Sequence, residues 1–262
     1  MCLRILFAAA AVLSAKSYSV DGVVVATDPA ARTILVAHRP IANYMPAMTM
    51  PFRVEQSEAL AGLHPGVRIN FDLVVNKEHS IVRNLRKTPG GDVEIPPPKE
   101  RLQVGDPVAE FELTDQQGRR VRLSDFRGKV VAVNFIYTRC PLPDMCPRLA
   151  ANFAALARRF ENRDLVLLSV TVDPDYDTPA VLAEYAKRWR ADGPGWRFLT
   201  GDVSRLAGQL GEVYWADEGS IGHNSMTSVI SRDGRLAARV EGAGYRVDQI
   251  QALIAHELEK AR

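Results

Sequence analysis

Residues 88–100 divide the chain into two parts that have different patterns of secondary structure. This segment reads Thr-Pro-Gly-Gly-Asp-Val-Glu-Ile-Pro-Pro-Pro-Lys-Glu, and its proline run favours an extended polyproline conformation. We therefore expect a semi-rigid linker that lets two domains face each other while they remain separate. The chain of 262 residues is long enough for two such domains.

The part before the linker, residues 18–87, predicts short strands and little helix. Val20–Ala26 and Thr33–Ala37 are β-branched and apolar, and Asp28-Pro29-Ala30 between them has the chemistry of a hairpin turn. Val67–Val75 and His79–Leu85 give a second strand pair. This strand count and spacing fit a small all-β barrel of OB type.

The part after the linker, residues 101–262, predicts strands that alternate with helices and then a hairpin and a last helix. This order fits an α/β thioredoxin-like layer. The main segments are strand Val130–Tyr137, helix Arg148–Phe160, strand Leu165–Val172, helix Pro179–Trp189, the hairpin turn Asp233-Gly234 and the amphipathic helix Val247–Arg262.

Two cysteines, Cys140 and Cys146, lie where the strand Val130–Tyr137 gives way to the helix Arg148–Phe160. The amides and the dipole of a helix N-terminus favour thiolate over thiol. Because thiolates attack disulfides and bind soft metals, both a redox pair and a pair of metal ligands are open. The spacing excludes the smallest Cys-x-x-Cys turn, but a disulfide stays geometrically possible.

His223 lies in a small polar segment, Gly219–Met226, which is predicted to be a loop. In a thioredoxin-like layer this loop lies beside the N-terminus of the redox helix, so His223 can join the cysteines. Two thiolates and one imidazole suit Cu(I), and also Cu(II) or Zn. The alternative is that His223 is simply solvated.

Asp173 follows the strand Leu165–Val172 and has two open roles. It can orient a metal ligand through a hydrogen bond, or it can cap the helix that begins near Pro179. The structural role is favoured, with Thr178 or Asp177 as the residue that caps the helix itself.

Three methionines, Met45, Met48 and Met50, fall close together after His38. In a strand, Met48 and Met50 point to the same face because side chains alternate. Thioethers with a nearby imidazole form a soft ligand set that selects Cu(I) over hard cations. The alternative is that these methionines fill a barrel core.

The string His38-Arg39-Pro40-Ile41, followed by Pro46-Ala47-Met48-Thr49-Met50, resembles the CusF family of periplasmic copper-binding barrels. The resemblance covers residues 18–87 and implies that His38, Met48 and Met50 bind Cu(I). In that family a Trp caps the ion through its ring face. Met45 stands at that position here, beside Tyr44, and can serve as an additional thioether ligand.

Residues 101–262 resemble the Sco/SenC family in several separated motifs. These are Asn134-Phe135-Ile136-Tyr137-Thr138-Arg139-Cys140-Pro141, Val172-Asp173-Pro174-Asp175-Tyr176-Asp177-Thr178-Pro179 and the glycine-rich segment with His223. The resemblance implies copper bound by Cys140, Cys146 and His223. Family members help metallate the binuclear copper site of cytochrome c oxidase, and some act mainly as thiol reductases. The family's cysteines lie closer together, and its His follows an Asp where Gly222 stands here.

The N-terminus predicts export. Arg4 precedes the apolar run Ile5–Leu13, and small residues follow, which is the pattern of a secretory signal peptide over residues 1–17. The run is too short to span a bilayer comfortably, since about 20 apolar residues are needed. The alternative is an uncleaved first strand or helix. Removal of the peptide takes Cys2 with it and leaves one cysteine pair in a periplasmic or otherwise exported protein, where disulfides can form.

Two functions follow from these residues. The first is an exported copper chaperone, not primarily an enzyme, that binds copper and delivers it to an acceptor such as a cytochrome c oxidase subunit. The second is a thiol–disulfide oxidoreductase in which Cys140 or Cys146 is the nucleophile. The methionine–histidine set in the same chain favours copper. A net charge of +2 with no basic stripe argues against nucleic acid, and a membrane contact is expected only through the N-terminal segment if it is uncleaved.

Overall fold

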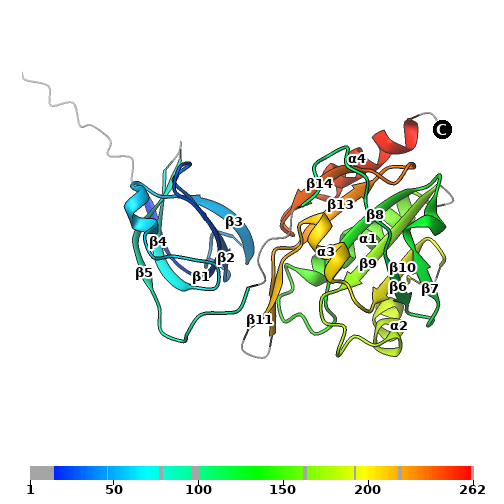
Figure 1. Ribbon diagram of the computed structural model, residues 1–262, viewed down its shortest axis with the longest axis horizontal. Helices are drawn as coiled ribbons and strands as arrows, with labels where there is room; N and C mark the ends of the chain where they lie inside the picture. Colours follow the sequence, from blue (N-terminus) through cyan, green and yellow to red (C-terminus); the bar gives the residue numbers. More distant parts are fainter. Residues whose placement is uncertain are drawn as a thin grey trace, which may run out of the picture.

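The chain forms two units, one on each side of the linker (Figure 1). The computed structural model describes residues 15–45, 47–76, 79–95, 101–161, 164–191, 193–217 and 220–260. The predicted signal peptide lies outside the described residues except at its last positions, as do Pro46 and the end of the linker. No helix in this described part is both long and apolar enough to cross a membrane.

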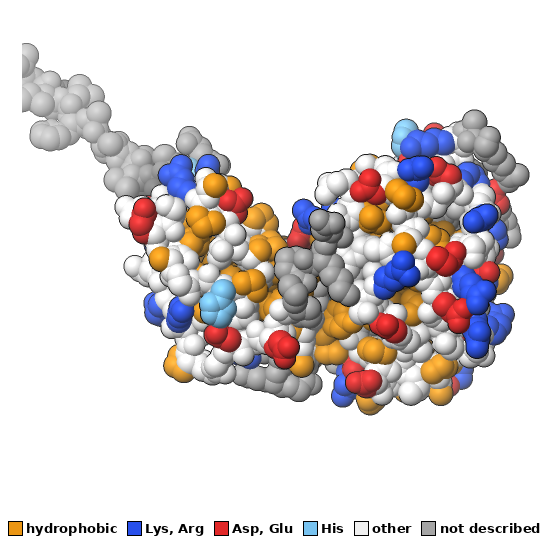
Figure 2. Space-filling model, viewed as in Figure 1, with side chains coloured by type: hydrophobic (Ala, Val, Ile, Leu, Met, Phe, Trp, Pro, Cys, Tyr) orange, Lys and Arg blue, Asp and Glu red, His pale blue; other side chains and the backbone are white. Residues whose placement is uncertain are grey.

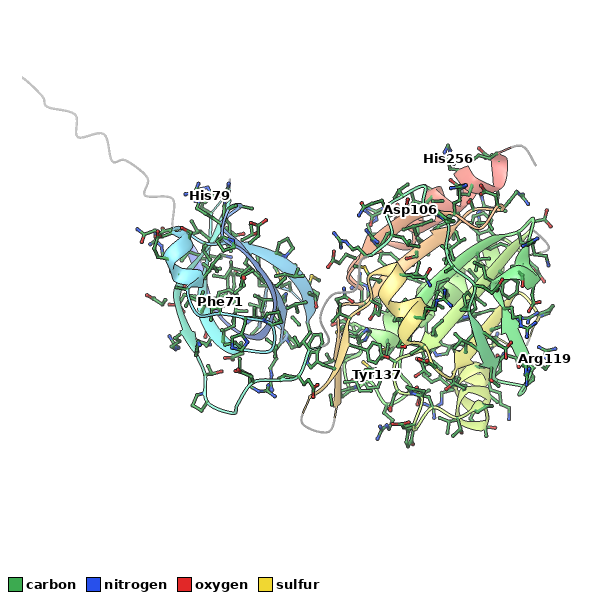
Figure 3. The ribbon with its side chains drawn as sticks, in the orientation of Figure 1. Phe71, His79, Asp106, Arg119, Tyr137 and His256 are labelled. Carbon is green, nitrogen blue, oxygen red and sulfur yellow. The ribbon has the colours of Figure 1, made fainter. Side chains whose placement is uncertain are left out.

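The first unit, here called the N-terminal unit, is an antiparallel sheet with the strand order β3-β2-β1-β4-β5. Asp28 fixes the first hairpin turn, because its Oδ1 accepts from the amide of Ala31 at 2.9 Å. Phe71 points into the interior of the unit (Figure 3). The elements are β1 (Lys16–Asp28), β2 (Thr33–His38), β3 (Met48–Arg53), the 3-10 helix η1 (Ser57–Leu60), β4 (Arg68–Val75) and β5 (Ser80–Lys87).

The all-β prediction for this unit is confirmed, whereas closure into a barrel is not. Strand β3 ends one edge of the sheet and β5 ends the other. Just beyond β3, Val54 forms a single parallel bridge with Val82 of β5, so the edges approach without a continuous ladder. A closed barrel of OB type therefore stays a prediction.

The second unit, here called the C-terminal unit, is built on a sheet with the order β14-β13-β8-β9-β10-β6-β7. Strands β8, β9 and β10 are parallel, and β13 and β6 pair with them in the antiparallel sense. The strands are β6 (Glu112–Asp115), β7 (Arg120–Arg122), β8 (Val130–Ile136), β9 (Leu165–Thr171), β10 (Trp196–Thr200), β13 (Met226–Ile230) and β14 (Leu236–Glu241).

Helices cover this sheet, as the predicted thioredoxin-like layer requires. Helices α1 and α4 contact each other and both pack on β8, while α2 packs on β10. Strands β8 and β9 are buried at every position, which is typical of parallel strands covered on both faces. The helical elements are η2 (Leu123–Phe126), α1 (Cys146–Arg159), α2 (Pro179–Arg188), α3 (Ser204–Leu210) and α4 (Val247–Glu259).

A second, two-stranded sheet carries His223 and corrects the prediction of a polar loop. Strands β11 (Tyr214–Asp217) and β12 (Ser220–His223) form an antiparallel hairpin in which Trp215 lies opposite Gly222. A Cβ at position 222 would lie 2.4 Å from the indole ring of Trp215. Because glycine has no Cβ, the ring can lie across this strand, and His223 becomes buried instead of solvated.

The two units touch through a small apolar cluster. It contains Val23 and Val25 of β1, Val93 of the linker and Trp215 of β11. Apolar side chains gather where the two units meet (Figure 2). The linker therefore does more than separate two domains, because Val93 is itself part of the contact.

Candidate metal centres

The segment with the two cysteines is anchored by aspartates that follow β9. The Asp177 carboxylate accepts from the amide of Thr138 at 3.0 Å and from the hydroxyls of Thr138 and Thr171, each at 2.5 Å. Burial raises the pKa of Asp177. These contacts fix the chain just before Cys140 against the neighbouring strand end.

Asp173 pairs with Arg139, the residue before Cys140. Arg139 donates to Asp173 Oδ2 from Nη2 at 2.6 Å and from Nε at 3.2 Å, and its guanidinium lies over the ring of Tyr176. The cap of α2 is Thr178, whose Oγ1 accepts from the amide of Val181 at 3.4 Å. The prediction that Asp173 caps this helix is therefore wrong, and Asp173 instead holds the cysteine segment.

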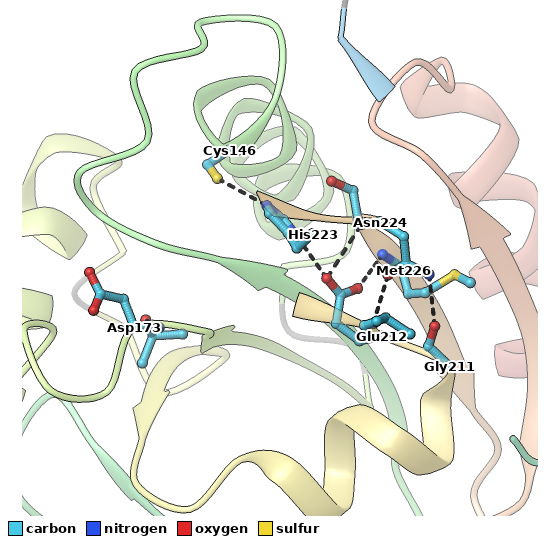
Figure 4. A network of polar contacts seen from close by, with 10 residues as sticks. Cys146, Asp173, Gly211, Glu212, His223, Asn224 and Met226 are labelled. Carbon is cyan, nitrogen blue, oxygen red and sulfur yellow. Dashed lines mark hydrogen bonds and ion pairs between the residues drawn. The ribbon is translucent and has the colours of Figure 1, made fainter. Parts of the chain in front are cut away.

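Cys146 and His223 are in contact and both are buried. Cys146 is the first residue of α1, and its Sγ lies 3.7 Å from His223 Nε2 (Figure 4). His223 Nδ1 lies 2.7 Å from Oε1 of Glu212, whose side chain is fully buried. Since a carboxylate only accepts, Nδ1 carries the proton and the Nε2 lone pair faces the sulfur.

Glu212 is the functional residue that the sequence interpretation missed. Its carboxylate also accepts from the amides of Met226 at 2.5 Å and Ser225 at 3.3 Å. A carboxylate behind the distal nitrogen of a histidine fixes the tautomer and orientation of a metal ligand. The only sequence signal is an acidic residue just after the helix α3, which by itself resembles an ordinary surface charge.

The pKa values of the two thiols are shifted in opposite directions. A hydrogen bond from Cys146 lowers the pKa of Cys140 to about 6, although burial opposes this shift. Burial raises the pKa of Cys146 well above its ordinary value. The sequence predicted that the helix N-terminus would favour thiolate, but the cysteine at that position is the one that stays protonated. The half-buried partner, Cys140, is the one whose lowered pKa favours the thiolate at neutral pH.

Cys140, Cys146 and His223 are neighbours, but they do not form a closed cage. Cys140 is half-buried and its Sγ lies 3.8 Å from the carbonyl oxygen of Leu142. Tyr137 stands beside the site, with its ring 6.0 Å from that of His223. Among the residues that the structure describes, no three His, Cys, Asp or Glu side chains are gathered closely enough to hold a metal ion.

His38, Met48 and Met50 share one face of the N-terminal sheet. His38 lies directly opposite Met48 on the neighbouring strand, and Met50 lies opposite Val36. Directly opposed residues in an antiparallel pair point to the same face, so the predicted common face is confirmed. His38 Nδ1 donates to the carbonyl of Arg39 at 2.8 Å, while Nε2 is buried without a hydrogen-bond partner.

The imidazole of His38 is suited to act as a neutral ligand. Burial lowers the pKa of His38, which keeps the ring uncharged, and the hydrogen bond to Arg39 leaves the Nε2 lone pair free. Tyr44 stacks on Tyr18 with ring centroids 4.4 Å apart. Met45 and Met50 are partly buried and pack against the core of this unit. The alternative prediction, that the methionines fill the core, is therefore partly correct for Met45 and Met50.

The C-terminal unit has a thioredoxin-like fold, and it is joined to a unit built on a β-sheet. The candidate ligands in both units are of the kinds that bind copper. A family model described as SCO1/SenC matches residues 99–259, and the chain belongs to that family. A second model, described as copper binding periplasmic protein CusF, matches residues 17–87. Copper, the metal predicted from the sequence, is confirmed by these matches.

Individual relatives agree with this assignment. A SCO1 protein homolog of Bacillus subtilis is 33% identical over 105 residues, which span 38% of this chain and 53% of that protein. A putative copper-binding protein of Stutzerimonas stutzeri is 28% identical over 176 residues, spanning 63% of this chain and 81% of that protein. The solved structure of BsSco, described as having a disulfide switch and as a member of the Sco family of cytochrome c oxidase assembly proteins, is 25% identical. It has a TM-score of 0.52 and covers 61% of this chain and 100% of its own.

Proposed function

We propose that the chain is an exported copper chaperone that binds Cu(I) at two sites and delivers copper for assembly of the cytochrome c oxidase copper site. The observation that carries this proposal is the buried contact of Cys146 with His223, backed by Glu212. A histidine with its lone pair aimed at a thiol, and its other nitrogen held by a carboxylate, is arranged as a metal ligand.

Cys140, Cys146 and His223 form the C-terminal copper site. Sulfur and imidazole ligands suit Cu(I) in geometries with few ligands. The low pKa of Cys140 makes its thiolate available at neutral pH. Cys146 loses its proton as the metal binds, because the thiolate is the form that ligates. The total charge of two thiolates and one Cu(I) is −1, and the neutral His223 adds none.

His38, Met48 and Met50 form the N-terminal copper site. The supporting contacts are the cross-strand pair of His38 with Met48 and the unpartnered Nε2 of His38. Thioethers and a neutral imidazole carry no charge, so this site holds Cu(I) less tightly than a thiolate site and can release it.

The domain boundaries belong to the same proposal. Residues 1–17 are a signal peptide, 18–87 the CusF-like domain, 88–100 the linker and 101–262 the Sco/SenC domain. The similarity of residues 17–87 to a periplasmic copper-binding protein supports export. The description of BsSco as a cytochrome c oxidase assembly protein supports an oxidase subunit as the acceptor.

A thiol–disulfide reductase is the second candidate, and one observation favours it. The pair combines a thiolate of low pKa at Cys140 with a buried, protonated partner at Cys146. That asymmetry is what a nucleophilic and a resolving thiol need. In this reaction Cys140 attacks the acceptor disulfide, one acceptor sulfur leaves as thiolate, and Cys146 then displaces the second acceptor sulfur while the pair becomes a disulfide.

Delivery to a defined acceptor tests the proposal against this alternative. The reduced, copper-loaded chain is mixed with the soluble copper-binding domain of a cytochrome c oxidase subunit, supplied once with free thiols and once with its cysteines as a disulfide. Chaperone function predicts copper transfer to the dithiol form. If the chain instead reduces the disulfide form and transfers no copper to the dithiol form, the reductase is correct and the chaperone proposal fails.

A further inference from the structure

We infer that Cu(I) passes directly from the N-terminal site to the C-terminal site, across a cavity that residues of both units line. This inference rests on the proposed function, because it assumes that both sites bind copper. The inference adds a route for the ion and a docking contact between the two units. That contact keeps donor and acceptor ligands at the same cavity.

The cavity has a volume of about 650 Å³ and both candidate sites open into it. His38 and Met48 line it from the N-terminal unit, and Cys140 and His223 line it from the C-terminal unit. Tyr137, which lies in the C-terminal unit (Figure 3), also contributes to the wall. Residues of both candidate sites therefore share one cavity.

Two of the predicted ligands of the N-terminal site, His38 and Met48, contribute to the wall of this shared space. His38 is buried, yet its Nε2 has no hydrogen-bond partner. Met48 reaches the other unit, since a Cβ on Gly244 would lie 3.1 Å from its Cε. Of the two methionines predicted as ligands, Met48 lines the cavity and Met50, two positions further along β3, does not.

Trp215 docks the hairpin that carries His223 onto the N-terminal unit. Its side chain is buried against Val23 and Val25 of β1, on the face opposite the core residue Val24. Trp215 is also part of the cavity wall, and Gly222 leaves room for its ring. The same apolar contact thus joins the two units beside the cavity that His38 and His223 both line.

The transfer is a ligand exchange in which no electron moves. The bonds from copper to His38 Nε2 and to the methionine sulfurs break. Bonds form to the Sγ atoms of Cys140 and Cys146 and to His223 Nε2, and any thiol proton still present leaves to water. Copper stays Cu(I) throughout. The direction is set by charge, because anionic thiolates attract the cation more strongly than neutral thioethers.

The kinetics of copper loading test this route in the full-length, reduced chain. Cu(I) is presented as its bicinchoninate complex, and the thiolate-to-copper absorption band reports arrival at the cysteines. Copper held at Met48 has an effective concentration of about 1 mM toward the second site, against about 10 µM in the external complex, as is usual for tethered partners. We therefore expect Met48→Leu to slow cysteine loading by about 10- to 100-fold.

Variants of the docking contact separate the route from the sites themselves. Val25→Glu puts a charge into the apolar contact and should slow cysteine loading at least several-fold, with the final occupancy of the cysteine site unchanged. Trp215→Leu weakens the same contact from the other side, in case the first variant perturbs β1. Ala59→Glu, on the exposed helix η1, is the control for added charge and should load at the wild-type rate.

The outcomes distinguish the two proposals. Slow loading in Met48→Leu and in both docking variants, with a normal end point in Val25→Glu, supports the shared route. A normal end point reached at the wild-type rate in all three variants overturns the route but leaves two copper sites standing. Absence of the thiolate-to-copper band in the wild-type chain overturns the proposed function and the route with it.

Discussion

Replacing Glu212 by glutamine should weaken copper binding at the cysteine site while leaving the fold in place. The Glu212 carboxylate accepts from His223 Nδ1 at 2.7 Å and from the amides of Met226 at 2.5 Å and Ser225 at 3.3 Å. A glutamine side chain has one accepting oxygen, and its NH₂ group would face a donor. At least one contact to a charged acceptor is therefore lost.

The size of the effect follows from these contacts. A hydrogen bond to a charged group contributes about 1.5–3 kcal/mol. Loss of a partner behind a metal ligand usually lowers metal affinity by about 10- to 100-fold, which corresponds to about 1.4–2.7 kcal/mol. The two estimates agree, so we expect Glu212→Gln to raise the Kd for Cu(I) at the cysteine site by this factor.

The assay is a competitive Cu(I) titration against a chromogenic chelator in a Met48→Leu background, which leaves the cysteine site to be measured alone. Glu259→Gln changes an exposed glutamate at the end of α4 and is the matched control. Circular dichroism checks that the variant is folded. If folded Glu212→Gln binds Cu(I) as tightly as the Glu259→Gln control, Glu212 does not hold His223 for the metal and the reasoning is refuted.

Two further predictions concern acidity and packing. Because the pKa of Cys140 is lowered from an ordinary 9.0 to about 6, its alkylation by iodoacetamide should rise with pH up to about 6 and then level off. Cys146→Ala should move this midpoint upward, and a wild-type midpoint near 9 would contradict the assignment. Gly222→Ala should destabilise the C-terminal unit by about 1–3 kcal/mol, since its Cβ would overlap the ring of Trp215. Thermal unfolding measures this loss, and Gly195→Ala, where a Cβ meets nothing within 4 Å, is the control that should unfold like the wild type.

Local patterns in the sequence were enough to predict most of the fold. Continuous apolar runs correctly indicated β8 and β9, because both faces of these strands are buried. Thr178 followed by Pro179 correctly marked the start of α2. These features depend on near neighbours in the chain, which is why they can be recognised without a structure.

The hairpin β11–β12 could not be predicted in the same way. Its strands are short, and the glycines and polar residues around residue 219 resemble a loop. What makes it a hairpin is the packing of Trp215 across Gly222 and against β1, a contact with a distant part of the chain. Position 222 is glycine here, unlike the family pattern, because this packing leaves no room for a side chain.

The sequence indicated which side chains of the candidate site lie near one another but not what surrounds them. Cys146 and His223 are in contact as expected, whereas the burial of Glu212 behind His223 depends on tertiary placement. The prediction about thiolates also failed at one residue. The helix N-terminus favours the thiolate at Cys146, but desolvation is the larger effect there and raises its pKa.

The central claim is that one chain carries two separate Cu(I) sites, and binding stoichiometry tests it most directly. The mature, reduced chain is titrated with Cu(I) under a competing chelator, together with Cys140→Ser and Met48→Leu. The account predicts two ions for the wild type and one for each variant, with the thiolate-to-copper band lost only in Cys140→Ser. A single ion in the wild type that both substitutions abolish would contradict it, because the two ligand sets would then form one shared site.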